Sequence, residues 1–302
     1  MKAFIAAEIG SNWEGSYTKA KKIIQECKKA GADAVKFQMW KAKELYNKSH
    51  PNWNEIKRAE LSFQTAKKLK EFSDKQKIEF FCSAFYPDAV EFLTSIGVKK
   101  FKVASRTCLL KDPYSFETLK KKAESKKQII ISMGMGGNQG KISKIFEKNN
   151  TIFCYCISDY PLKFEKINWK QAVKYDGFSD HTMNIIAPIL FTILKKQKRS
   201  KIIYIEKHVK LKNSKGPDAS TSIDTEQLSN LVSQIRIFEK NRYWSVDFMN
   251  NNINKYISHW NQFNMIKKEI TDTVIISNLE SMITNNTNNM KKEWGVLPPP
   301  SI

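Results

Sequence analysis

Several kinds of residue are scarce in this 302-residue chain. It has four histidines and five cysteines, an odd number. No apolar run approaches the roughly 18 residues that a membrane helix needs, and the first residues lead directly into a strand pattern rather than a signal peptide. Without a secretory signal, an odd number of cysteines favours a reducing compartment and no disulfide framework. The sequence therefore predicts a cytoplasmic protein that does not cross a membrane.

Acidic residues are also in the minority, with 30 Asp and Glu against 51 Lys and Arg, which gives a formal net charge of +21. A basic chain can bind nucleic acid. Here the lysines are scattered over predicted helix faces, and no recognition motif accompanies them. The composition favours no nucleic-acid partner and is compatible with an anionic small substrate. A nucleic-acid-binding or structural protein stays as an alternative that the charge alone motivates.

Hydrophobic periodicity predicts eight alternating strands and helices. The expected strands cover residues 4–9, 34–38, 78–83, 100–105, 128–132, 151–157, 177–179 and 202–209. The expected helices cover residues 18–29, 57–76, 87–96, 114–125, 140–148, 165–174, 184–196 and 224–240, with a polar loop at 40–56. Eight such repeats predict an α/β fold, a (β/α)8 TIM barrel over residues 1–242. Residues 243–302, which end in a proline run, are predicted to be a C-terminal extension.

Polar residues gather at or near the predicted carboxyl ends of these strands. A strand buried on both faces is expected to be apolar, and charges there are costly unless they meet a ligand or one another. In a TIM barrel these strand ends form one rim, which carries the chemistry. The sequence therefore predicts a site that includes Glu8, Lys36, Gln38, Ser83, Lys102, Ser105, Ser132, Ser158, Ser179, His181, Glu206 and His208. For Lys36, the alternative is a structural ion pair with Glu8.

His181 and His208 form the central pair of this rim. They lie 27 residues apart (208 − 181), about one strand-plus-helix unit of such a barrel. Imidazole suits divalent transition metals, so the pair indicates a metal site. The alternative is that His181 caps a turn and His208 is a hydrogen-bonded core residue. Asp180, beside His181, could orient a metal ligand.

Seven stretches together resemble the sialic acid (N-acetylneuraminate) synthase family, whose members condense phosphoenolpyruvate with an acetamido sugar. They follow the family's order over residues 4 to about 224. They are Glu8-Ile-Gly-Ser-Asn-Trp-Glu-Gly15, Gly31-Ala-Asp-Ala-Val-Lys-Phe-Gln38, Phe101-Lys-Val-Ala-Ser105, Ile131-Ser-Met-Gly-Met135, Tyr160-Pro161, Gly177-Phe-Ser-Asp-His-Thr182, and Ile205-Glu-Lys-His208 with Gly216-Pro-Asp218. The resemblance implies a homodimeric transferase that forms a 3-deoxy-ulosonic acid and phosphate from phosphoenolpyruvate and an aldose such as N-acetylmannosamine.

The resemblance also implies roles for individual residues. His181 and His208 would hold a divalent metal, expected to be manganese, with magnesium or cobalt as alternatives. Glu8 would be the acid or base, counted as catalytic with Lys102 and the two histidines. The residues expected around the phosphate and carboxylate of phosphoenolpyruvate are Lys36, Lys102, Ser105, Ser132 and Ser179, and those expected at the sugar are Gln38, Tyr160 and Asp218. The predicted substrate-binding set also includes Ser83, Arg106 and Ser158.

The chain departs from the family pattern in three places. Trp13 stands where the family's first loop has a histidine, and Thr107 stands where a glutamate is usual. Residues 243–302 show no counterpart of the family's antifreeze-like domain. Arg106 is similar to an arginine that related ulosonate-phosphate synthases place near phosphate, so a different or phosphorylated aldose is an alternative acceptor. A barrel that binds a sugar or anion without turnover is the other alternative.

Overall fold

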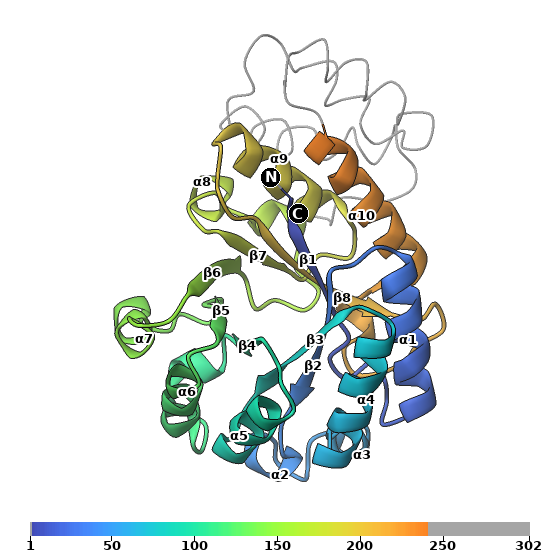
Figure 1. Cartoon of the computed structure of the whole chain (residues 1–302), viewed down its shortest axis with the longest axis vertical. Helices are drawn as coiled ribbons and strands as arrows, with labels where there is room; N and C mark the ends of the chain where they lie inside the picture. The colour runs from blue at the N-terminus through green and yellow to red at the C-terminus, as the bar shows by residue number, and fades with distance from the viewer. Residues whose placement is uncertain (1, 241–302) are drawn as a thin grey trace.

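Eight parallel strands close into a barrel at the centre of the molecule (Figure 1). The computed structural model describes residues 2–240, and the predicted extension at 243–302 lies outside them. The strands are β1 Phe4–Glu8, β2 Ala34–Met39, β3 Glu79–Ala84, β4 Lys100–Val103, β5 Gln128–Ser132, β6 Thr151–Cys156, β7 Gly177–Asp180 and β8 Tyr204–Lys210. Each pairs with the next in chain order, and β1 pairs with β8, which closes the sheet. A two-residue strand, β9 (Ile223–Asp224), pairs in parallel with the end of β8.

Helices surround the barrel, so the predicted (β/α)8 fold is confirmed. The main ones are α1 Tyr17–Lys29, α4 Phe63–Lys75, α5 Pro87–Ser95, α6 Ser115–Glu124, α7 Gln139–Ile145, α8 Trp169–Ala172, α9 Ile186–Gln197 and α10 Thr225–Lys240. Helix α10 packs against both α1 and α9, which brings the end of the described chain beside its start.

Three of the predicted segments differ from the structure. Of the helix predicted over residues 165–174, only α8 (Trp169–Ala172) is α-helical, after a 3-10 turn at Phe164–Lys166. The prediction of one helix over residues 57–76 is wrong, because α4 begins only after Ser62, whose hydroxyl caps it by accepting from the Thr65 amide at 3.2 Å. The predicted loop at 40–56 contains two short helices, α2 (Ala42–Leu45) and α3 (Trp53–Arg58). These helices bury a separate apolar cluster formed by Trp40, Ala42, Ile56, Ala59 and Phe85. This burial holds the insertion on the rim of the barrel.

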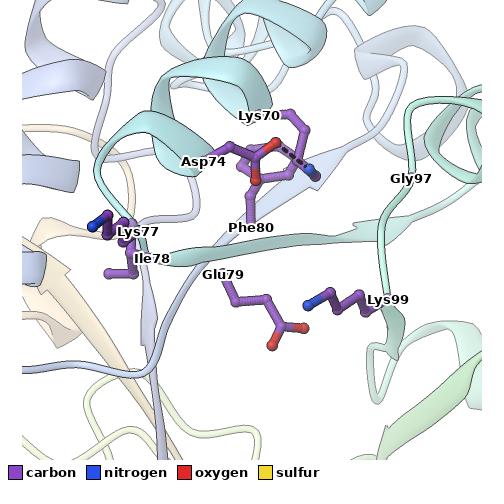
Figure 2. A pocket seen from close by; sticks show the side chains of 8 residues that line it. All are labelled: Lys70, Asp74, Lys77, Ile78, Glu79, Phe80, Gly97 and Lys99. Carbon is purple, nitrogen blue, oxygen red and sulfur yellow. Dashed lines mark hydrogen bonds and ion pairs between the residues drawn. The ribbon is translucent and has the colours of Figure 1, made fainter.

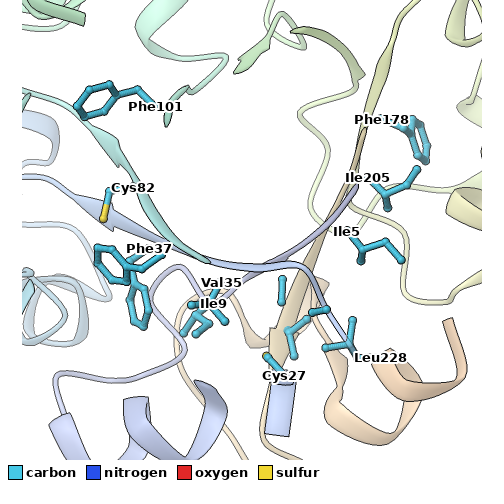
Figure 3. Packing of buried hydrophobic residues seen from close by; sticks show 14 of the residues in the cluster. Ile5, Ile9, Cys27, Val35, Phe37, Cys82, Phe101, Phe178, Ile205 and Leu228 are labelled. Atoms are coloured by element: carbon cyan, nitrogen blue, oxygen red, sulfur yellow. The ribbon is translucent and has the colours of Figure 1, made fainter. Parts of the chain in front are cut away.

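The largest hydrophobic cluster lies between the strands and the helices. Outward-facing residues of the strands, such as Val35 and Phe37, belong to the same cluster as Cys27 of α1 and Leu228 of α10 (Figure 3). A second, smaller cluster fills the inside of the barrel and is called the apolar plug below: Ala6, Ala34, Phe81, Ile130, Ile152, Cys154 and Tyr204. The plug separates the polar groups at the carboxyl ends of the strands from the Glu79–Lys100 ion pair at their amino ends.

One buried ion pair links β7 to β8 on the side of the sheet away from the barrel interior. Lys207 Nζ lies 2.6 Å from Asp180 Oδ2, and both side chains are fully buried. Thr182 donates to the same carboxylate from its amide and its hydroxyl, both at 2.9 Å. The pair therefore has the additional hydrogen bonds that a buried carboxylate needs.

None of the helices within residues 2–240 is both long and apolar enough to cross a membrane. The five cysteines, all of which lie in this part of the chain, are free thiols. The prediction of no disulfide framework is thus confirmed.

We expect Lys207→Met to lower the free energy of unfolding by about 3–5 kcal/mol, because it leaves the Asp180 carboxylate buried without a cation. Urea unfolding followed by circular dichroism measures this. The matched control is Lys70→Met, which breaks the pair between Lys70 and the largely exposed Asp74 and is expected to cost less than about 1 kcal/mol. Equal losses in the two variants would contradict the prediction.

Candidate active site

A layer of charged side chains lies directly on the apolar plug, on the inner face of the barrel. Along β1 the inner position changes from Ala6 to Glu8, and along β8 it changes from Tyr204 to Glu206. Side chains two residues apart on a strand share one face. On each of these two strands, the predicted polar rim therefore begins at the inner position that follows a residue of the apolar plug. The plug excludes water from beneath the charged layer.

The carboxylate of Glu206 is the most highly connected group in this layer. Its Oε1 lies 2.6 Å from Lys102 Nζ and 3.5 Å from Lys36 Nζ, and it accepts from Ser179 Oγ at 3.1 Å. Its Oε2 accepts from Tyr204 Oη at 2.7 Å. Burial alone would raise the pKa of Glu206, but Lys102 and Lys36 hold it well below its ordinary value. Burial likewise acts to lower the pKa of Lys102, and the contact with Glu206 raises it above the ordinary range. Both groups are therefore charged at neutral pH.

Glu8 is the second buried carboxylate of the layer. Lys36 Nζ lies 2.8 Å from its Oε2, and Gln38 Nε2 donates to its Oε1 at 2.6 Å. Lys36 also donates to Ser83 Oγ at 3.2 Å. Burial raises the pKa of Glu8 to about 7, although Lys36 acts to lower it, and the nearby Glu206 adds to the rise. The structure thus contains the Lys36–Glu8 ion pair that was the alternative for Lys36, and this pair is part of the charged layer itself.

Hydroxyl groups line the β4, β5 and β6 side of the rim. Ser105 Oγ accepts from the Gly134 amide at 2.9 Å. The backbone of Gly134 passes so close to its neighbours that a Cβ there would lie 2.9 Å from Ser158 Oγ. The buried Ser132 Oγ has no hydrogen-bond partner among the described residues. A buried hydroxyl without a partner is available to a ligand.

The two predicted metal-binding histidines lie side by side. Their ring centroids are 5.4 Å apart, and the Tyr160 ring lies 4.3 Å from that of His181. Burial lowers the pKa of His181 to about 4 and also lowers that of His208, so both rings are neutral. His181 Nδ1 is 2.7 Å from the Ile157 carbonyl oxygen, which leaves the lone pair on Nε2. His208 Nδ1 is buried without a partner in the described chain. Two neutral imidazoles with free nitrogen lone pairs fit a divalent metal.

Asp218 is brought to the rim by the loop after β8. Its Oδ2 accepts from both the amide and the hydroxyl of Ser11 at 2.7 Å. Gly10 lies between Asp218 and Gln38: a Cβ at Gly10 would lie 2.4 Å from Asp218 Oδ2 and 3.3 Å from Gln38 Nε2. The φ angle of Gly10 is +51°, a conformation that glycine adopts readily. Two of the three residues expected at the sugar, Gln38 and Asp218, therefore meet across this glycine.

Arg106 is not brought into the charged layer. Its Nε and Nη2 donate to the two carboxylate oxygens of Asp112 at 2.7 and 2.8 Å, and Nη2 also donates to the Leu45 carbonyl at 2.7 Å. Substrate binding by Arg106 therefore stays a prediction, and a ligand would have to share its guanidinium with Asp112. The sequence offered no signal for Asp112 as a partner.

The prediction that Asp180 orients a metal ligand is wrong. Its carboxylate pairs with Lys207 and Thr182, and the carbonyl of Ile157 holds the His181 ring instead. Trp13, which departs from the family pattern, is buried in the large hydrophobic cluster. Sequence reasoning missed the central role of Glu206, although its position at a strand end had marked it as part of the rim.

A pocket at the opposite end of the barrel does not belong to this site (Figure 2). It lies where β3 begins, and Glu79 and Phe80 contribute to its wall. Its carboxylates are already paired, Asp74 with Lys70 and Glu79 with Lys100. TIM barrels place their chemistry at the carboxyl ends of the strands, and this pocket lies at the amino ends.

We expect the fold to lose stability relative to a Glu8→Gln variant as the pH rises. In the native protein the pKa of Glu8 is raised from 4.5 to about 7, so between these values the native state binds a proton that the unfolded chain does not. The wild type should lose about 3 kcal/mol of unfolding free energy relative to the variant between pH 4.5 and pH 8. Urea unfolding of both proteins across this range measures the difference. A difference that is independent of pH would contradict the raised pKa.

Comparisons with known proteins agree with this geometry. The model of the NeuB family matches residues 23–243. The N,N'-diacetyllegionaminic acid synthase of Legionella pneumophila is 33% identical over 267 residues, which cover 78% of this chain and 72% of that protein. Human N-acetylneuraminate-9-phosphate synthase is 30% identical over 263 residues, covering 78% and 70%. The crystal structure of N-acetylneuraminic acid synthetase from Leptospira borgpetersenii in complex with citrate has a TM-score of 0.71 at 27% identity, covering 85% of this chain and 92% of that one. The chain belongs to the NeuB family.

Proposed function

We propose that this protein condenses phosphoenolpyruvate with an aldose to give a 3-deoxy-ulosonic acid and phosphate. The expected acceptor is N-acetylmannosamine or a related acetamido sugar. The observation that carries the proposal is the pair of buried carboxylates in one charged layer, with the pKa of Glu8 raised to about 7 and that of Glu206 held low. Carboxylates whose pKa values are pushed apart are typical of sites that use one as an acid or base and keep the other ionised. Membership of the NeuB family supports the same reaction.

Two lysines and several hydroxyls would bind the anionic substrate. Lys36 and Lys102 are buried, and they face Glu8 and Glu206 across ion pairs of 2.8 and 2.6 Å. Ammonium groups bind phosphate and carboxylate through charge-assisted hydrogen bonds. The partnerless Ser132 hydroxyl lies at the same rim. Phosphoenolpyruvate would share these donors with the two glutamates.

Glu8 would move the protons of the condensation. As C3 of the enol attacks the aldehyde carbon, protonated Glu8 gives a proton to the aldehyde oxygen, which becomes a hydroxyl group. The attack leaves a cationic centre at C2, and water adds there after giving a proton back to Glu8. The bond between C2 and the phosphate oxygen then breaks as the new C2 hydroxyl becomes the keto group, and the hydroxyl proton leaves with the phosphate. A carboxyl group with a pKa near 7 is suited to both transfers, because neither protonation state is strongly favoured at neutral pH.

His181 and His208 would hold a divalent metal, for which we propose manganese. Their neutral rings and free nitrogen atoms fit this role. No group of three or more His, Cys, Asp or Glu residues suited to a metal occurs within residues 2–240, so water and substrate oxygens would supply the other ligands. When bound, the metal supplies a Lewis acid for the aldehyde oxygen. The homodimer that the resemblance implies stays a prediction.

The decisive assay is phosphate release from phosphoenolpyruvate with a panel of acetamido aldoses, with manganese and after chelation. Release should need both the metal and one of the sugars. His208→Ala should lower kcat by about 100-fold or more, because it removes a predicted metal ligand. The matched control is His50→Ala, since His50 lies in a surface loop where its Nδ1 accepts from the Asn52 amide.

Each other outcome has a defined meaning. Release that continues after chelation would show that the two histidines are not metal ligands. No release with any sugar, from a folded protein that binds manganese, would favour a sugar- or anion-binding barrel without turnover.

A further inference from the structure

Three residues on the rim form a unit that we call the Arg106 clamp: Tyr46, Arg106 and Asp112. The guanidinium of Arg106 is held along one edge by the two carboxylate oxygens of Asp112, at 2.7 and 2.8 Å. Its carbon Cζ lies 5.3 Å from the centre of the Tyr46 ring. The additional bond from Nη2 to the Leu45 carbonyl fixes the group to the insertion between β2 and α4. Edge and face of the guanidinium are therefore both occupied by the protein itself.

The clamp lies beside the part of the rim that would bind the sugar. Burial raises the pKa of the Tyr46 phenol, Arg106 acts to lower it, and the carboxylates of Asp218 and Asp112 add to the rise. Tyr46 lies in the insertion that follows β2, the strand that carries Gln38, and Arg106 directly follows Ser105 just after the end of β4. The clamp therefore lies on the rim, at the carboxyl ends of these strands.

The charges around the clamp disfavour the phosphate group of a phosphorylated acceptor. Asp112 neutralises Arg106, and Asp218 adds a carboxylate whose known partner is the uncharged Ser11. A phosphate binds arginine best along two N–H groups of one edge, and the edge formed by Nε and Nη2 is taken by Asp112. A phosphorylated sugar would have to displace this carboxylate or approach it at close range.

We propose that Asp112 is a specificity-determining residue that excludes phosphorylated acceptors by occupying the guanidinium edge that a phosphate group would need. The acceptor is then an aldose whose end distant from the aldehyde carries hydroxyl groups and no phosphate group. This inference rests on the proposed condensation reaction for its biological meaning, but the clamp itself can be tested by binding. Removal of the Asp112 carboxylate should turn Arg106 from a neutralised group into a phosphate-binding one.

The test uses the full chain and calorimetry at low salt, with N-acetylmannosamine 6-phosphate as the probe. Asp112→Asn should bind this probe on the order of tenfold more tightly than the wild type, because one adjacent negative charge is lost. The double variant Arg106→Gln with Asp112→Asn should lose the gain. Asp74→Asn, which removes the carboxylate of an ion pair at the other end of the barrel, should behave as the wild type does.

A second variant keeps the test informative if Asp112→Asn does not fold. Arg106→Met in the otherwise native chain should leave the affinity for the 6-phosphate unchanged, because the guanidinium is not available to it. A weaker affinity in Arg106→Met, or no gain in a folded Asp112→Asn, would overturn the proposal. So would a wild type that prefers the 6-phosphate to the free sugar in kcat/KM.

The same preparations separate this proposal from the proposed function. If the wild type releases no phosphate from phosphoenolpyruvate with either sugar, the condensation reaction is in doubt, whatever the calorimetry shows. If release occurs with the free sugar and Asp112→Asn gains nothing for the 6-phosphate, only the role of Asp112 is wrong.

Discussion

The contact between Glu206 and two lysines is the interaction on which the rest of the site depends. Lys102 and Lys36 lie 2.6 and 3.5 Å from the same carboxylate oxygen, and all three side chains are buried. Any one of these charges alone would be strongly destabilising inside a barrel. Together they stabilise the ionised forms of Glu206 and Lys102, since the lysines lower the pKa of Glu206 and Glu206 raises that of Lys102. The protein can thus keep two ammonium groups at its centre before any ligand arrives.

Because Lys36 and Lys102 are already paired with glutamates, an anionic substrate would bind by taking over some of these ion pairs. With Glu8 and Glu206 ionised, two carboxylates balance the charges of Lys36 and Lys102. With Glu8 protonated the same four groups carry one net positive charge. An anion entering the rim would therefore favour the protonated form of Glu8, which is the form that can give a proton to an aldehyde oxygen. The raised pKa of Glu8 follows mainly from its burial above the apolar plug, so the packing of the barrel interior and the chemistry of the rim are physically linked.

The sequence could predict the barrel and most of the rim because both depend on local patterns. Strands buried on both faces appear as short apolar runs, and a polar residue at the end of such a run is conspicuous, as Lys36 and His208 are. The partners of these residues were harder to predict. Asp112 follows Arg106 by six residues in a loop whose path depends on tertiary contacts with Leu45, and no periodicity reports such contacts. The break between α3 and α4 was missed for a related reason, because the cap at Ser62 interrupts a stretch whose apolar spacing continues.

The two sides of the rim differ in charge, and this difference suggests how one enzyme would keep its two substrates apart. The side formed by β2, β4 and β7 contributes Lys36, Lys102 and Ser179 around one shared carboxylate. The side formed by the loops contributes Asp218 and Asp112, and its one guanidinium is neutralised. With Glu8 protonated, the first side carries one net positive charge and would attract an anion. Before a metal binds, the carboxylate of Asp218 would disfavour an anion on the second side, whereas a neutral sugar would be disfavoured on neither. The many surface lysines behind the net charge of +21 contribute little to this choice, because exposed charges more than a Debye length away are largely screened at physiological salt. Buried and half-buried groups, few in number, would therefore determine where each substrate binds.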